Sequence, residues 1–251
     1  MTFLATLKTL FYGVLLACTV FVEVTAQENK LEIITENWAP YNYLENGVVT
    51  GFSVEIVQAI MAELGESHKI TLYPGARGES MLDNLPNIMS FSLFRTPARE
   101  EQYKWIGPIS KEAIYFYKRK NDARVFKSFY DIEKVKKISV AHKGLVLSFV
   151  EAKGLTNIHK MPKLEAQFRH VLMGRADLSV NATPLGVAYY LKKLNRTTDA
   201  LVKTQVKLLE FPLYIACSKQ IPDSVINKWQ QAFENVKASG QYQRIYSKYL
   251  H

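Results

Sequence analysis

The sequence predicts an α/β fold made of two similar units, on the evidence of three observations. Short apolar segments alternate with segments of helical period in two successive runs, an order typical of mostly parallel sheets covered by helices. Apolar strand-like segments at 113–117 and 211–218 lie between the two runs and after the second. The length of 251 residues allows one large domain or two units of roughly 100–120 residues, and the two successive runs favour two units. We therefore expect two α/β lobes, each with helices on both faces of its sheet, connected by these two strands.

In the first run, local signals mark the expected elements. Ser53 is a good N-cap for a helix that carries apolar residues at helical spacing and ends at Gly65. The dipeptide Asn46-Gly47 predicts a hairpin turn, and Pro86 stops a short helix. The expected order is strand 31–34, helix 53–64, strand 69–73, helix 80–85 and strand 87–92.

The second run has the same character. Gly154 and Gly174 are natural helix ends, and Pro184 suits the first turn of a helix. Apolar residues recur at helical spacing in the C-terminal stretch, so we expect one terminal helix there. The expected order is helix 131–136, strand 137–141, helix 145–153, strand 157–160, helix 164–174, strand 176–181, helix 184–194, strand 211–218 and helix 222–249.

Residues 1–26 have the three parts of a secretory signal peptide. Lys8 precedes an apolar run over 10–22, and Val24 and Ala26 stand at positions −3 and −1 of a small-residue cleavage site. The run is shorter than the roughly 20 residues that a membrane-spanning helix needs. We therefore expect secretion with cleavage after Ala26, with an uncleaved N-terminal anchor and lipidation at Cys18 as alternatives.

Composition excludes several classes of protein. The chain is 48% hydrophobic, which is too apolar for a disordered protein, and its two cysteines are too few for a disulfide scaffold. After signal removal only Cys217 remains, and its apolar neighbours predict a buried thiol rather than a nucleophile. None of the five histidines stands in a metal-ligand spacing, and no phosphate-binding loop or nucleophile motif occurs. We expect neither a metal nor a cofactor.

The net charge of +9 permits an anionic partner, which includes nucleic acid, a membrane surface or a small molecule. Nucleic acid is disfavoured because the basic residues are scattered, lack a recognition motif and belong to a secreted chain. We interpret the charge mainly as a solvated basic surface.

Five segments in register resemble the bacterial extracellular solute-binding proteins of family 3. They are 35–43 with Asn46-Gly47, the segment 51–56, the segment 95–108 beginning Arg-Thr-Pro-Ala-Arg-Glu, the segment 174–180, and the closing segment 240–249. Together they span the chain from about residue 30 to 250 in order.

The resemblance implies a two-lobed periplasmic-binding-protein-like fold of type II with two hinge strands. Lobe 1 would comprise 28–114 plus 216–251, and lobe 2 would comprise 115–215. Such proteins close around a solute by hinge motion, and most deliver it to an inner-membrane ABC permease. The chain is thus expected to be a monomeric periplasmic binding protein and not an enzyme, with no stable membrane insertion after signal cleavage.

Sheets of this class bind ligands at the carboxyl ends of their strands, which points to three loops of lobe 1. The first loop offers aromatic side chains, the second offers one arginine, and the third offers hydroxyl groups and two arginines. The candidates from lobe 1 are Trp38, Tyr41, Tyr43, Arg77, Ser92, Arg95, Thr96 and Arg99. Alternatives stay open: Trp38 and Tyr43 suit the lobe core, and Arg77 and Arg95 suit a solvated face.

Arg99 falls where the family's motif carries the arginine that grips a carboxylate, a role for which the guanidinium fork is suited. Lobe 2 would add backbone N–H groups at a helix start near Gly144, and Asn181 after the strand 176–181. In amino-acid-binding members an acidic residue follows that strand and pairs with the ligand's ammonium group. The stretch from Val180 to Thr183 has no carboxylate, which favours an anionic or aromatic ligand that lacks an ammonium group over an α-amino acid.

Two other functions remain open. A secreted sensor or partner protein would use the same fold without a permease. A periplasmic dehydratase, as found among a few relatives of this fold, would need a general acid or base in the cleft, and Glu36 and Glu79 are the available carriers.

Overall fold

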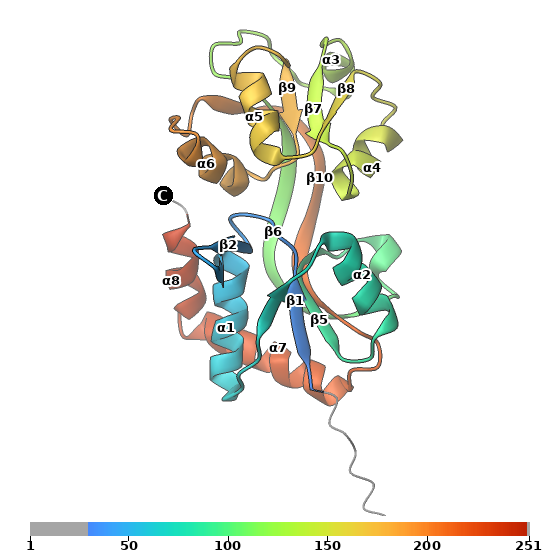
Figure 1. Cartoon of the computed structure of the whole chain (residues 1–251), viewed down its shortest axis with the longest axis vertical. Helices are drawn as coiled ribbons and strands as arrows, with labels where there is room; N and C mark the ends of the chain where they lie inside the picture. Colours follow the sequence, from blue (N-terminus) through green and yellow to red (C-terminus); the bar gives the residue numbers. More distant parts are fainter. Residues whose placement is uncertain (1–29, 250–251) are drawn as a thin grey trace, which may run out of the picture.

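The computed structural model describes residues 30–249. Figure 1 shows two groups of elements, one above the other, joined by the long strands β6 (Lys104–Arg119) and β10 (Leu201–Cys217). The strand β6 contains the predicted segment 113–117, and β10 contains the predicted segment 211–218 except its last residue; both strands begin well before these segments. The predicted lobe boundaries, 114/115 and 215/216, fall inside β6 and β10, and we use them to name the lower group lobe 1 and the upper group lobe 2.

Lobe 1 is built on a parallel core of three strands, in which β1 pairs with both β4 and β5. The strand β10 then joins β5 in the antiparallel sense and carries the sheet on to β6. The elements of this lobe besides β6 and β10 are β1 (Glu32–Thr35), β2 (Tyr43–Glu45), β3 (Val48–Thr50), α1 (Phe52–Leu64), β4 (Ile70–Leu72), α2 (Gly75–Asn84), β5 (Ile88–Phe94), the 3₁₀ turn η1 (Pro97–Arg99), α7 (Asp223–Ala238) and α8 (Gln241–Lys248).

Lobe 2 repeats this plan. Its central strand β7 is parallel to β8 and β9, and β6 pairs with β9 in the antiparallel sense. The full strand order is β4-β1-β5-β10-β6-β9-β7-β8, which confirms the predicted α/β class. The elements are α3 (Phe129–Glu133), β7 (Ile138–Ala141), α4 (Leu145–Ala152), β8 (Ile158–Met161), α5 (Leu164–Leu172), β9 (Leu178–Val180) and α6 (Pro184–Lys193).

Several local signals act as predicted, and one does not. Asn46 and Gly47 have φ values of 50° and 80°, which suit the tight turn between β2 and β3. Gly65 ends α1 in the left-handed conformation at φ 67°. The N-cap of α1, however, is Gly51 rather than Ser53, because the cap lies two residues earlier and Ser53 is buried in the first turn of the helix.

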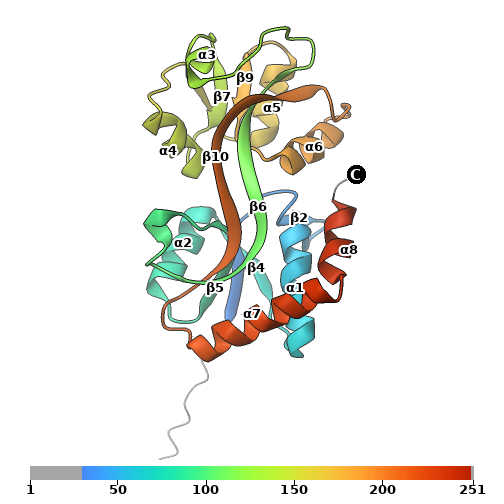
Figure 2. The same cartoon turned by 180° about the vertical axis from the view of Figure 1, so that it is seen from behind.

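The C-terminal stretch is two helices, not the single helix that the sequence suggested. Gly240 adopts φ 72°, which a right-handed helix cannot continue through, and the chain turns there from α7 into α8. Both helices pack against α1. Figure 2 shows α7 lying across lobe 1, with α8 rising beside α1.

The core is continuous along the crossing strands and buries Cys217 completely, as predicted. Burial raises the pKa of its thiol above the usual range, so the thiol stays protonated. Within residues 30–249, no helix combines the length and the apolar character needed to cross a membrane. The predicted signal peptide, its cleavage after Ala26 and the lipidation alternative at Cys18 lie outside the described residues.

Candidate ligand-binding cleft

A cavity of about 510 Å³ lies between the two lobes and is lined from both. Its walls are mostly the segments at the carboxyl ends of six strands, three in each lobe, together with the start of α2, Arg99, and Ser90 and Ile114 within β5 and β6. This is the position that the general rule for α/β sheets predicts for a ligand. The wall segments are 35–38 after β1, Tyr73 after β4, 92–94 at the end of β5, 141–146 after β7, Pro162 after β8 and Asn181 after β9.

Arg99 ends the turn η1 and faces the cavity. Its Nη2 donates to Oε1 of Glu79 on α2 at 2.5 Å, and its side chain is 22% exposed. Only one guanidinium nitrogen takes part in this contact, so the remaining N–H donors can hold a second carboxylate. Glu79 therefore orients the Arg99 side chain and leaves most of its N–H donors available to a ligand.

Glu36 follows β1 and is the second carboxylate of the cavity wall. Glu36 is an exposed residue, yet its carboxyl group lies inside the cleft, where desolvation raises its pKa and the nearby Glu79 adds to this effect. Arg99 and, from lobe 2, Lys143 act in the opposite direction. Four charged groups, two of each sign, thus surround the same space.

The start of α2 leaves room for Glu36. A Cβ atom built on Gly75 would lie 2.5 Å from Oε2 of Glu36, which is closer than real Cβ contacts allow. The carboxyl group of Glu36 has no hydrogen bond or ion pair with any residue in 30–249. Its charge is consequently available to a ligand.

Lobe 2 contributes mainly backbone and one cation. Gly144 has φ 95°, a conformation that favours glycine, and it stands at the N-cap of α4. The first N–H groups of a helix have no partner within the helix, so the start of α4 suits an anionic ligand group. Lys143 lies beside it and is exposed.

The floor of the cavity on the lobe 1 side is partly apolar. The ring centroids of Trp38 and Phe94 are 5.6 Å apart, and both residues line the cavity. Ser92, at the φ value of 65°, is buried there, and its hydroxyl group has no hydrogen-bond partner among the described residues. An unsatisfied buried hydroxyl facing a cavity is suited to a ligand contact.

Of the ten residues predicted as ligand contacts, the structure brings five to the cavity wall: Trp38, Ser92, Arg99, Gly144 and Asn181. Tyr41 and Tyr43 do not line it. The hydroxyl groups of Tyr41 and Thr183 are hydrogen-bonded at 2.9 Å in a fully buried position, and the rings of Tyr43 and Tyr189 pack at 5.3 Å. Both tyrosines instead connect lobe 1 to lobe 2 beside the cavity.

Three other predicted residues also lie outside the cavity wall. Arg77 points to solvent, with its guanidinium 4.8 Å from the ring centroid of Tyr73. Arg95 is paired with Glu100 and packs on aromatic rings, and Thr96 is buried at the start of η1. The solvated alternative for Arg77 therefore describes it better than a ligand contact does.

From the sequence, Glu36 and Glu79 are identified only as candidate general acids or bases and not as ligand-binding groups. The position of Glu36, directly after β1, could have identified it by the strand-end rule. Glu79 had no such signal, because α2 begins at Gly75 and not at the predicted residue 80. The stretch from Val180 to Thr183 has no carboxylate, but Glu36 and Glu79 bring two carboxylates to the cavity from lobe 1.

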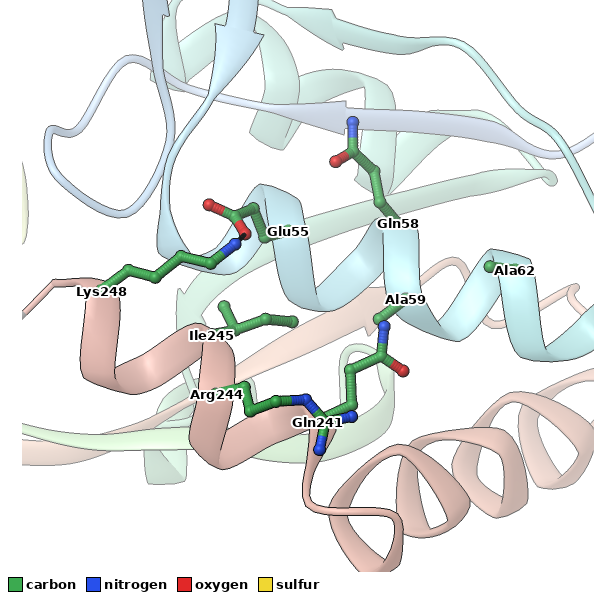
Figure 3. A pocket seen from close by; sticks show the side chains of 8 residues that line it. All are labelled: Glu55, Gln58, Ala59, Ala62, Gln241, Arg244, Ile245 and Lys248. Carbon is green, nitrogen blue, oxygen red and sulfur yellow. Dashed lines mark hydrogen bonds and ion pairs between the residues drawn. The ribbon is translucent and has the colours of Figure 1, made fainter.

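A second hollow of about 450 Å³ lies on the surface of lobe 1, between α1 and α8 (Figure 3). Its charged residues are largely paired, since Nζ of Lys248 lies 2.5 Å from Glu55. It is remote from the strand ends, so we place the ligand in the interlobe cavity. Across residues 30–249, no cluster of three or more His, Cys, Asp or Glu residues is arranged to hold a metal ion.

Comparison with known proteins gives a consistent assignment. Residues 31–251 match the model of the bacterial extracellular solute-binding proteins, family 3. The chain is 25% identical over 224 residues to the Probable amino-acid-binding protein YxeM of Bacillus subtilis (strain 168), covering 84% of this chain and 80% of that protein.

Two solved structures share the fold. A histidine kinase sensor domain with similarity to periplasmic binding proteins has a TM-score of 0.75 at 16% identity, covering 88% of this chain and 96% of its own. An ancestral amino-acid-binding protein, described as a precursor of cyclohexadienyl dehydratase, has a TM-score of 0.69 at 24% identity, covering 88% and 95%.

Proposed function

The chain belongs to family 3 of the bacterial extracellular solute-binding proteins, and on this premise we propose that its cleft captures a small amino-acid-like solute. The observation that carries this proposal is the presence of free acidic and basic groups in one cavity. The guanidinium of Arg99 keeps N–H donors that are not engaged by Glu79, and the carboxyl group of Glu36 has no partner among the described residues.

The chemistry of these groups suggests how the ligand lies. Arg99, Ser92 and the start of α4 at Gly144 are donors and suit the ligand's carboxylate. Glu36 suits its cationic group, and Trp38 covers its apolar part. The B. subtilis relative, which bears the name of an amino-acid-binding protein, supports the same ligand class. Asn181 adds a neutral polar contact from lobe 2.

We place the chain in the periplasm, after cleavage of residues 1–26, and propose an inner-membrane ABC permease as its partner. Family membership implies an extracytoplasmic location, and delivery to a permease is the usual role of such binding proteins. The two connecting strands β6 and β10 give the lobes a hinge through which capture and release would proceed.

Sensing is the second candidate function, because a histidine kinase sensor domain shares the fold over 88% of this chain. The adjacent gene product separates the two roles: a permease indicates transport, and a kinase indicates sensing. An enzymatic role would require Glu36 to act as a general acid or base, for which its raised pKa is the sole support. Consumption of a cyclohexadienyl acid by the purified chain would establish that role.

A thermal-shift screen tests the proposed function. The probes are L-amino acids, dicarboxylic acids, diamines and aromatic acids, each at a large excess. A ligand at about 100 times its Kd stabilises the native state by about 2.7 kcal/mol, which raises the Tm of a chain of this size by about 5–10 °C. We expect an amino acid to produce this shift. A response only to dicarboxylic acids would make the ligand an organic acid, and no response from any class would refute the proposal.

A further inference from the structure

The two lobes differ sharply in charge. Residues 115–215 contain 19 Lys and Arg residues against 8 Asp and Glu residues, whereas residues 30–114 and 216–249 contain 12 against 13. The whole excess of positive charge in the described chain therefore belongs to lobe 2. A charge imbalance of this kind between two parts of one chain points to an anionic partner.

Part of this charge gathers at the end of lobe 2 that faces away from the cavity. The strand β7 runs from Ile138 at this far end to Ala141 in the cavity wall, so the segments before β7 and β9 lie at the far end (Figure 1). Five cations on these segments are exposed and take part in none of the ion pairs found in residues 30–249: Lys127, Lys134, Lys136, Lys137 and Arg175.

Large apolar side chains are exposed at the same end. Val125 and Tyr130 are each 63% exposed, and Met173 is 60% exposed. The ammonium group of Lys134 lies 3.7 Å from the ring centroid of Tyr130, so charge and aromatic surface are adjacent. We call these eight residues the distal surface: Val125, Lys127, Tyr130, Lys134, Lys136, Lys137, Met173 and Arg175.

We propose that the distal surface binds the headgroup layer of an anionic phospholipid membrane. Lysines are compact charges that are attracted to an anionic surface without fixed geometry, and each contributes about a factor of five in affinity. Exposed tyrosine and aliphatic side chains among them suit the interface between headgroups and acyl chains. A nucleic acid would use the charges but gives no reason for the three exposed apolar residues, and capture by an acidic protein is an outcome of the test below.

This binding would hold the chain at a membrane surface with its cleft uncovered. None of the eight residues lines the cavity, and lobe 1 stands on the opposite side of the cavity from them. The distal surface therefore acts independently of the ligand and of the proposed solute-binding role.

Vesicle co-sedimentation tests the proposal. The chain from Gln27 onward retains every described element and lacks the apolar N-terminal run, which could itself insert into lipid. It is mixed with vesicles of phosphatidylglycerol and phosphatidylethanolamine, or of phosphatidylcholine alone, at low and high salt. The test variant is K134Q/K136Q/K137Q. The control variant is K69Q/K111Q/K219Q, which removes three exposed and unpaired lobe 1 cations, so both variants have the same net charge.

We expect the wild-type chain and the control variant to bind the anionic vesicles more tightly than phosphatidylcholine at low salt. The test variant should bind the anionic vesicles about 100-fold more weakly than the wild-type chain at low salt. Salt screens the charges, so the binding that remains at high salt should depend on the apolar side chains and should be weaker in Y130S/M173S. Equal loss in the control variant would reduce the effect to total charge and overturn the proposal. Failure of the wild type to bind anionic vesicles, or its capture by poly-glutamate in their place, would also overturn it. Unchanged thermal unfolding of each variant excludes misfolding.

Discussion

The two lobes have the same α/β plan, but they differ in net charge and in the chemical groups that they contribute to the cavity. Lobe 1 is almost neutral overall, yet it supplies Glu36, Glu79 and Arg99 to the cavity. Lobe 2 carries the excess positive charge, yet its cavity wall offers mainly the start of α4, Asn181 and a single exposed lysine, Lys143. Net charge is therefore a poor guide to the ligand site in this molecule. The ligand is selected by the few side chains that face the cavity, whatever the net charge of the lobe that carries them.

Arg99→Ala should have the largest effect on ligand binding, because it removes the guanidinium that faces the cavity from lobe 1. Truncating one partner of a desolvated charge pair costs about 2–5 kcal/mol of binding free energy. Lys143→Ala, from lobe 2, should cost less than tenfold in affinity because Lys143 is exposed. Calorimetry with the ligand identified by the screen measures both, and Arg77→Ala is the control outside the cavity. Equal losses for Arg99→Ala and Lys143→Ala would contradict the division between the lobes.

Gly75→Ala should weaken ligand binding about tenfold, or about 1.4 kcal/mol, while leaving the fold intact. The new Cβ displaces the Glu36 carboxyl group, the flexible end of a side chain. Gly78→Ala is a matched control on the same helix and the same cavity wall, since its Cβ would meet only Ile34, at an ordinary 3.6 Å, and would not touch Glu36. Both changes improve helix propensity, so neither should lower the Tm. If the two variants bind ligand equally well, Glu36 does not contact the ligand.

Tyr41→Phe should lower the free energy of unfolding by about 1 kcal/mol, the usual net value of one buried hydrogen bond. The change removes the bond to Thr183, which links the lobes at 2.9 Å. Tyr43→Phe is the control, because no hydrogen bond is found for its hydroxyl group among residues 30–249 and its ring packing on Tyr189 would survive. Urea unfolding measures both variants. A neutral Tyr41→Phe would mean that this contact does not hold the lobes together.

Glu36→Gln should have the smallest effect, a modest rise in Tm of the ligand-free chain at pH 7. Desolvation raises the folded-state pKa of Glu36 above 4.5, so its ionised form destabilises the native state. Protonated Glu36 stabilises the native state. This contribution is present in full when the pH is below the pKa of Glu36 in the unfolded chain, and it is lost as the pH rises through the pKa of Glu36 in the folded chain. The advantage of Glu36→Gln should therefore disappear below about pH 4.5. An advantage that persists at acid pH would point to a cause other than charge.

The fold could be predicted from the sequence because its signals are local. Alternating apolar segments predicted β1, β4 and β5, and Asn46-Gly47 predicted the hairpin. The break at Gly240 was missed because apolar residues keep helical spacing on both sides of it.

The site could be predicted only in part, since side-chain direction depends on tertiary packing. Tyr41 and Arg99 both belong to loops at strand ends, yet one is buried against Thr183 and the other faces the cavity. Glu79 comes to the cavity because α2 begins at Gly75, and the sequence carries no start signal there.

A crystal structure with the ligand from the screen would show whether the ligand spans the acidic and basic groups of the cavity. We expect the ligand's carboxylate within hydrogen-bond distance of Arg99 and the start of α4, and its cationic group within hydrogen-bond distance of Glu36. A ligand held in the cavity by lobe 2 alone, or bound in the hollow between α1 and α8, would contradict it.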